Sequence, residues 1–246
     1  MTDSDERPGR APDALRGRGL VKRYGRTTAL AGVDLSVRRG ERVALFGHNG
    51  AGKTTLLKIL AGLARPTEGT VEVGGGKAGS PAARRALGFV SHETLLYDEL
   101  TGRENLAFYA RLYALPEPRA LIGRALAWSG LEAHADLPVG SYSRGMQQRL
   151  ALARATLHDP DVLLFDEPFT GLDPGAARVL TAHLEALGAA GKTVVFTTHD
   201  IEAGYRIAAR AVGMRRGRVV CDEATRPDGA RDFAARAGSW LAEVRP

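Results

Sequence analysis

The clearest chemical signal in the sequence lies between Gly47 and Thr54, which read GHNGAGKT. This spacing fits the phosphate-binding loop pattern, and it follows an apolar run at residues 43–46 and precedes a predicted helix at 54–64. Backbone N–H groups turned inward by the glycines, together with the helix N-terminus, hold a triphosphate. Lys53 reaches the β and γ phosphates, and the Thr54 hydroxyl binds the bridging Mg²⁺. The expected ATP contacts are Gly47, His48, Asn49, Gly50, Ala51, Gly52, Lys53, Thr54 and Thr55.

A second candidate group is the acidic pair Asp166 and Glu167, which ends the apolar run at residues 162–165. Parallel sheets present the carboxyl ends of their strands to the ligand, so Asp166 is expected to bind Mg²⁺ and Glu167 to polarise the attacking water. An acidic pair that merely starts a turn is the alternative. His199 follows the strand predicted at 193–198, and we interpret it as a γ-phosphate sensor rather than an ordinary loop residue.

These residues need a parallel sheet to bring them together. Short apolar runs at residues 43–46, 87–90, 162–165 and 194–197 are separated by helical stretches, which predicts an α/β fold with a largely parallel central sheet. Residues 33–37 alternate like a half-buried strand. Between about residues 95 and 158 the strand signal gives way to three predicted helices, at 103–113, 119–129 and 144–157. The chain then returns to short strands at 211–214 and 218–221 and a final surface helix.

Composition narrows the class of protein. With 246 residues and 44% hydrophobic content the chain can form one core with a smaller subdomain, and no run approaches the ~18 apolar residues of a membrane span. The single cysteine, Cys221, excludes intrachain disulfides. The net charge of +6 is scattered, and the basic cluster of residues 16–26 is expected to be a solvated face, so no nucleic-acid partner is expected. Residues 1–13 have no secretory-signal character and are expected to be a disordered tail.

The stretch at residues 141–149, SYSRGMQQR, resembles the signature motif of ABC ATPases, with residues 142–146 at the motif itself. The resemblance implies a P-loop NTPase core with an N-terminal antiparallel β subdomain and a helical insert at about 95–158, an ATPase domain at 14–226 and a helical tail at 227–246. It also implies that two chains pack head to tail, as a homodimer or with a related ATPase, so that the signature of one meets the γ phosphate of the other. By itself Ser143 could be an ordinary helix cap. The residues carried over are Tyr24 on adenine, Ser143, Arg144, Gly145 and Met146 in the signature, and Asp173 in the coupling loop.

The chain departs from that family pattern in two places. A glutamine that senses the metal usually follows the strand near residue 90, where this chain has Ser91, His92 and Glu93; spacing favours His92 as the metal and nucleotide contact, with Glu93 the alternative. Arg144 and Met146 replace the usual glycine and glutamine of the signature, which resembles exporter ATPases. The segment 91–106 most resembles the haem exporter ATPase of cytochrome c maturation.

The resemblance leads to a functional prediction. The chain is expected to energise a separate permease from the cytoplasmic face of the membrane, and Leu95, Leu96 and Tyr97 are expected to help form the docking groove. The alternatives are the ATPase of a drug, polysaccharide or lipid exporter, a soluble ABC ATPase such as an iron–sulfur assembly component, and a regulator that binds ATP without hydrolysing it.

Overall fold

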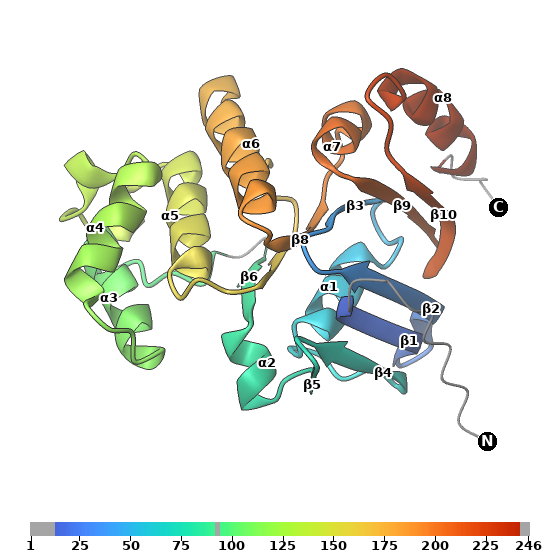
Figure 1. The fold of residues 1–246 in the computed structure, drawn as a ribbon, viewed down its shortest axis with the longest axis horizontal. Helices are drawn as coiled ribbons and strands as arrows, with labels where there is room; N and C mark the ends of the chain where they lie inside the picture. The colour runs from blue at the N-terminus through green and yellow to red at the C-terminus, as the bar shows by residue number, and fades with distance from the viewer. Residues whose placement is uncertain (1–12, 92–93, 242–246) are drawn as a thin grey trace.

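A six-stranded sheet forms the centre of the computed structural model, which describes residues 13–91 and 94–241 (Figure 1). Its strand order is β10-β9-β3-β8-β7-β6, and all neighbours are parallel except β10 and β9. This is the predicted α/β core with a mostly parallel sheet. The strands are β3 (Arg42–Phe46), β6 (Leu87–Val90), β7 (Val162–Phe165), β8 (Thr193–Thr197), β9 (Arg210–Arg215) and β10 (Arg218–Ala224).

A second, antiparallel sheet of four strands has the order β2-β1-β4-β5. Its strands are β1 (Asp13–Tyr24), β2 (Thr27–Arg38), β4 (Glu68–Val73) and β5 (Gly76–Lys77). Asp13 was assigned to the tail, but it pairs with Arg38 as the first residue of β1, so that boundary was wrong by one residue. Residues 1–12 of the expected tail lie outside the described residues.

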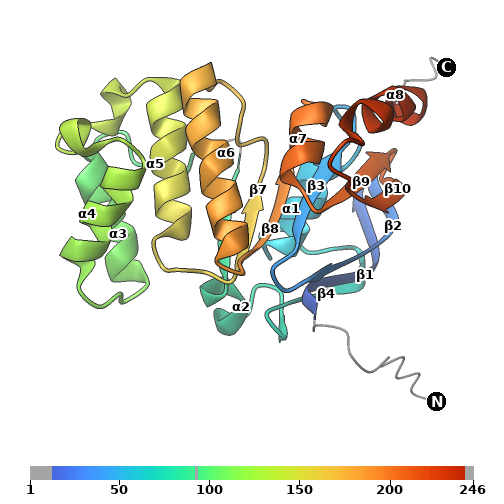
Figure 2. The ribbon, with the colours of Figure 1, turned by 45° about the horizontal axis from the view of Figure 1, so that its top comes forward.

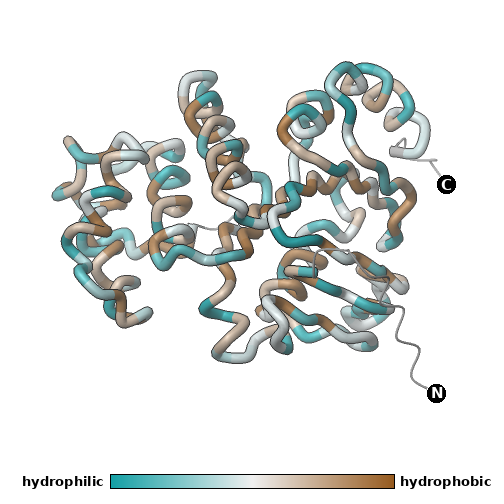
Figure 3. The backbone as a smooth tube through the Cα atoms, viewed as in Figure 1, coloured by the Kyte–Doolittle hydropathy of each residue, from teal (hydrophilic) through white to brown (hydrophobic). Residues whose placement is uncertain are grey.

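The central sheet separates two hydrophobic cores, one on each of its faces. Alternate residues of β3 face opposite sides: Val43 and Leu45 pack with β1, β2, β4 and helix α1, whereas Ala44 and Phe46 pack with the helices of the other face. Figure 3 shows the corresponding hydrophobic stretches along the central strands. The helices are α1 (Lys53–Leu60), α2 (Pro81–Arg85), α6 (Pro174–Ala189), α7 (Ile201–Ile207) and α8 (Ala230–Leu241). Helix α1 ends before the predicted residue 64, because Gly62 adopts a left-handed φ of 72°.

The remaining helices form a lobe at one side of the molecule, next to α6 (Figures 1 and 2). They are α3 (Gly102–Leu112), α4 (Pro118–Trp128) and α5 (Arg144–Thr156), with short 3-10 turns at Glu132–His134 and Val139–Ser141. Each predicted helix of this region is present, with ends within one residue. The lobe has its own core, which includes Leu106, Leu126 and Leu150. No helix in the described part of the chain is both long and apolar enough to cross a membrane.

Candidate functional site

The glycine-rich loop follows β3, lies against β9 and β2, and leads into α1. Gly47 has no room for a side chain, because a Cβ would lie 2.7 Å from Met214 O of β9. Gly52 has a φ of 104°, and a Cβ there would lie 2.6 Å from Ala29 O of β2. No side chain caps α1 at Gly52, so the first N–H groups of that helix remain available to an anion.

Lys53 lies at the centre of this loop. Its ammonium donates to Gly47 O at 2.6 Å and to His48 O at 3.3 Å. Burial lowers the pKa of Lys53, and the nearby charges of Glu167 and Asp166 oppose that shift. The lysine and both carboxylates predicted to share the site are therefore close enough to interact. Thr54 is exposed and Thr55 half-buried at the start of α1.

Asp166 and Glu167 follow β7 and are joined by one hydroxyl. Thr197, fully buried at the end of β8, donates to Asp166 Oδ1 at 2.8 Å and accepts the Glu167 N–H at 2.7 Å. The Asp166 N–H in turn donates to Val90 O of β6 at 2.8 Å. Asp166 is only 2% exposed, so its carboxylate is held in one orientation.

Glu167 is held in a strained conformation beside His199. Its φ is 54°, in the left-handed region that side chains other than glycine rarely adopt. Its Oε1 lies 2.7 Å from His199 Nε2, and its Oε2 accepts from the Thr170 hydroxyl at 3.3 Å. His199, predicted to sense the γ phosphate, therefore lies in direct contact with the Glu167 carboxylate. The arrangement can orient a water molecule against a phosphate held by the loop.

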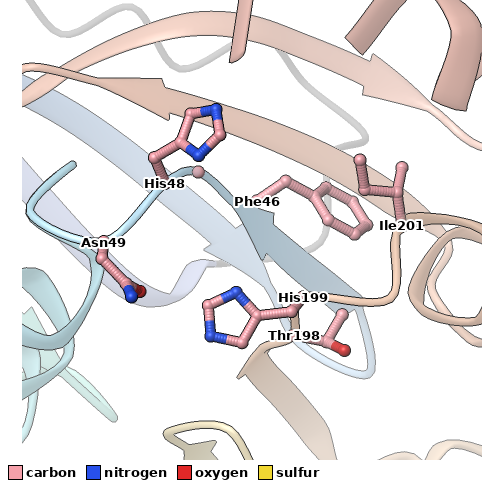
Figure 4. A pocket seen from close by; sticks show the side chains of 7 residues that line it. Phe46, His48, Asn49, Thr198, His199 and Ile201 are labelled. Carbon is pink, nitrogen blue, oxygen red and sulfur yellow. The ribbon is translucent and has the colours of Figure 1, made fainter. Parts of the chain in front are cut away.

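A pocket of about 420 Å³ opens beside the loop and His199. Figure 4 shows the His199 imidazole and the Asn49 side chain approaching each other across the space between the ends of β3 and β8. Its lining residues are Phe46, Gly47, His48, Asn49, Thr198, His199 and Ile201.

The signature stretch begins α5 and packs against the loop that follows Glu167. The Ser143 hydroxyl caps α5 by accepting the Met146 N–H at 3.3 Å. A Cβ on Gly171 would lie 3.0 Å from Arg144 Cδ, so the Arg144 side chain covers that glycine. Gln148 Nε2 donates to Pro168 O at 3.3 Å. Within the described chain no hydrogen bond joins Ser143 or Gly145 to the phosphate loop.

The remaining predicted residues are distributed around this centre. Asp173 caps α6 by accepting the N–H groups of Gly175 and Ala176, and these bonds lower the pKa of its carboxyl group. Tyr24 ends β1, is 51% exposed, and has the Lys22 ammonium 4.8 Å from its ring centroid. Neither the adenine contact nor the coupling role is tested by these contacts. His92 and Glu93 lie outside the described residues.

Sequence reasoning missed Thr197 and Gln148. The register of two parallel strands contained the signal for Thr197: Phe165 pairs with Phe196, so the next residues, Asp166 and Thr197, must be neighbours. Gln148 gave no such signal, because its partner is a backbone carbonyl in a loop.

Comparison with known proteins gives consistent results. A family described as ABC transporter matches residues 30–170. The chain is 43% identical over 211 residues to "Nod factor export ATP-binding protein I" of Burkholderia orbicola (strain AU 1054), covering 84% of this chain and 69% of that protein. It is 36% identical over 197 residues to "ABC transporter ATP-binding protein NatA" of Bacillus subtilis (strain 168), covering 78% and 80%. Among solved structures, the dimeric ATP-binding cassette MJ0796 in a post-hydrolysis state with ADP and Pi has a TM-score of 0.80 and 31% identity, covering 86% of this chain and 99% of that one.

Proposed function

The chain belongs to the ABC transporter family as an ATP-binding and ATP-hydrolysing subunit, and on that premise we propose that it drives export through a separate membrane permease from the cytoplasmic face. Support for export comes from the 43% identity to a protein named for Nod factor export. The relatives named above are not named for haem transport, so the haem and cytochrome c prediction rests on residues 91–106 alone.

The single observation that carries the proposal is the cluster of Lys53, Asp166, Glu167 and His199 at the carboxyl ends of β3, β7 and β8. In the proposed cycle Lys53 neutralises phosphate charge, and Glu167 takes a proton from the attacking water while His199 holds the carboxylate in place. The oxygen ligands of Thr54 and Asp166 fit Mg²⁺, which prefers hard oxygen donors. When bound, the metal would neutralise the charge that develops on the phosphates. Among the described residues no group of three or more His, Cys, Asp or Glu side chains could hold a metal ion by itself.

We also propose that the active unit is a dimer. In the described part of the chain the residues that open α5 make no hydrogen bond to the phosphate loop; they are Ser143, Arg144, Gly145 and Met146. A second copy is therefore needed to bring a signature helix to the γ phosphate. The family includes such pairs, since the MJ0796 cassette has been solved as a dimer. Asp173, which caps α6 beside the loop covered by Arg144, would lie next to that interface.

The proposed permease contact is an apolar surface on α3 and the segment before it. We call Leu95, Tyr97, Phe108 and Leu112 the docking surface; all four are exposed, and the Tyr97 and Phe108 rings pack edge to face with centroids 5.1 Å apart. Leu96, predicted to join this surface, instead packs against both the central and the lobe cores. Tyr97→Ala is expected to weaken permease pull-down; unchanged pull-down and unchanged permease-stimulated hydrolysis would remove this surface from the proposal.

The proposal is tested with wild type and Glu167→Gln, comparing ATP hydrolysis and, by size-exclusion chromatography in MgATP, dimer formation. Wild type is expected to hydrolyse ATP, and Glu167→Gln is expected to lose about 100-fold or more in rate, because it lacks the general base, while accumulating as an ATP-dependent dimer. Glu185→Gln, on an exposed position of α6, is the matched control and should behave as wild type. A hydrolytically silent wild type that stays monomeric with its permease present would overturn the proposal in favour of a regulator.

A further inference from the structure

Arg154 is a buried cation on α5 with an unusual set of neighbours. It is 9% exposed, its Nη2 donates to Phe89 O of β6 at 2.8 Å, and its guanidinium carbon lies 5.0 Å from the Tyr109 ring centroid. The buried Nε has no acceptor, and no carboxylate pairs with the guanidinium, in the part of the chain that the structure describes. Burying a charge without a counter-ion is costly, so stability alone does not account for an arginine here.

Tyr109, the aromatic neighbour of Arg154, is hydrogen-bonded to the backbone of the docking surface. Its hydroxyl donates to Leu95 O at 2.8 Å, and Leu95 has a left-handed φ of 54°. A residue in that region of conformational space is maintained only by its surroundings. The following turn is fixed by a fully buried Asn105, which accepts the Tyr97 N–H and donates to the carbonyls of Tyr97, Leu100 and Thr101.

These contacts form a continuous path between the signature residues and the docking surface. The signature residues lie at the N-terminus of α5, and Arg154 lies about 17 Å further along the same rigid helix at 1.5 Å per residue. From Arg154 the path continues through the Tyr109 ring and hydroxyl to Leu95. A second branch runs through Phe89 to the end of β6, whose Val90 O accepts the Asp166 N–H.

We propose that Arg154 and Tyr109 are positioning residues that couple the placement of the signature helix to the conformation of the docking surface, through the contact path Arg154–Tyr109–Leu95. The inference rests on the proposed function, because it requires a signature helix that meets nucleotide and a surface that meets a permease. When ATP closes the dimer, a displacement of α5 moves Arg154 and Tyr109 and so alters the hydrogen bond from Tyr109 to Leu95. In the other direction, permease binding at Leu95 changes the position of α5 through the same contacts.

The test uses Tyr109→Phe, which keeps the ring beside Arg154 and removes only the hydroxyl that reaches Leu95. Tyr113→Phe is the matched control. Tyr113 directly follows α3, one turn after Tyr109, and stacks on His158 with centroids 3.9 Å apart; its hydroxyl makes no hydrogen bond within the described residues. Both are built in the Glu167→Gln chain, and hydrogen exchange of residues 94–101 is measured with and without MgATP, alongside dimer formation and melting temperature.

We expect MgATP to change the exchange of residues 94–101 in Glu167→Gln and in its Tyr113→Phe derivative, and this change to be lost in the Tyr109→Phe derivative, with dimer formation retained. Arg154→Met is expected to lose the change too, and Arg154→Lys, which keeps a donor and a charge, to restore part of it. If the dimer forms and Tyr109→Phe responds like its parent, or if the parent shows no change, the coupling is wrong and the proposed function stands. If no ATP-dependent dimer forms, the proposed function fails and the coupling with it.

Discussion

Glu167 combines a chemical role with a conformational cost. Its φ of 54° would suit glycine, yet its carboxylate must lie beside His199. Strain of this kind persists at functional positions because the neighbouring contacts maintain it. Here the Thr197 hydroxyl holds the Glu167 N–H, and Thr170 and His199 hold its carboxylate.

A pair of substitutions at Glu167 separates the strain from the chemistry. Glu167→Gly and Glu167→Ala both lose the carboxylate, and both are expected to lose hydrolysis. The glycine variant is expected to be more stable than the alanine variant by about 1 kcal/mol, because only the alanine retains a Cβ in the left-handed region. Urea unfolding midpoints measure the difference; an alanine variant as stable as the glycine variant would show that the backbone relaxes on substitution.

Thr197 is expected to matter as much as the carboxylates that it joins. Thr197→Val leaves the half-buried Glu167 N–H and one buried Asp166 oxygen without their Thr197 partner, which is expected to cost about 2 kcal/mol of the free energy of unfolding and to slow hydrolysis. Thr197→Ser keeps the hydroxyl and should retain most of both. Equal behaviour of the valine and serine variants in unfolding and hydrolysis assays would exclude this role.

The sequence predicted which site residues come together where the motif and the strand ends agreed. Lys53, Asp166, Glu167 and His199 were found because parallel strands present their carboxyl ends at one edge. Thr197 was missed because its role depends on the register between β7 and β8, and Gln148 because its partner is a loop carbonyl. The roles of Tyr24, His92 and Asp173 stay predictions.

At the scale of elements, two ring stacks join the helical lobe to the core. Trp128 of α4 stacks on His183 of α6 with centroids 3.8 Å apart and an interplanar angle of 6°, and Tyr113 stacks on His158. Burial lowers the pKa of His183 to about 4, and burial also lowers the pKa of His158. Burial therefore favours the neutral form of both imidazoles.

The depressed pKa of His183 predicts acid sensitivity. The unfolded chain binds a proton on this imidazole near pH 6.5 and the folded chain only near pH 4, so stability falls as pH falls between these values. With allowance for partial exposure the loss is about 2 kcal/mol. His183→Phe keeps a ring stacked on Trp128 but cannot bind the proton. Its free energy of unfolding should therefore fall by about 2 kcal/mol less than that of wild type between pH 6.5 and pH 4. Parallel pH profiles of the unfolding free energy would contradict the prediction.

Periodicity predicted most elements but not all of their ends. The lobe helices and the central strands were found because each has a clear apolar pattern. Strand β1 (Asp13–Tyr24) was not predicted from its own pattern, because polar and glycine residues interrupt it. Helix α1 was predicted too long because alanine and leucine continue its pattern to residue 64, while Gly62 ends the helix by its backbone conformation.

At the scale of the whole molecule, nucleotide should stabilise the fold. MgATP at 100 times its dissociation constant is expected to add about 2.7 kcal/mol to the free energy of unfolding by mass action. Lys53→Ala should lose most of this gain, because the ammonium at the centre of the loop is absent, and EDTA should abolish hydrolysis by wild type. Melting temperatures with and without MgATP measure the gain. If MgATP raised the melting temperature of Lys53→Ala as much as that of wild type, the loop would not be the phosphate-binding site.

The packing around the phosphate loop has a consequence for biosynthesis. The strand that carries the loop, β3, is flanked by β8 and β9, and the Gly217 N–H of the following turn donates to Ala51 O at 3.0 Å. All three supports are translated long after the loop itself. A nascent chain therefore exposes its glycine-rich segment without lateral partners until the last strands leave the ribosome, so a premature stop before Arg210 would produce a chain that carries the whole motif and cannot retain ATP.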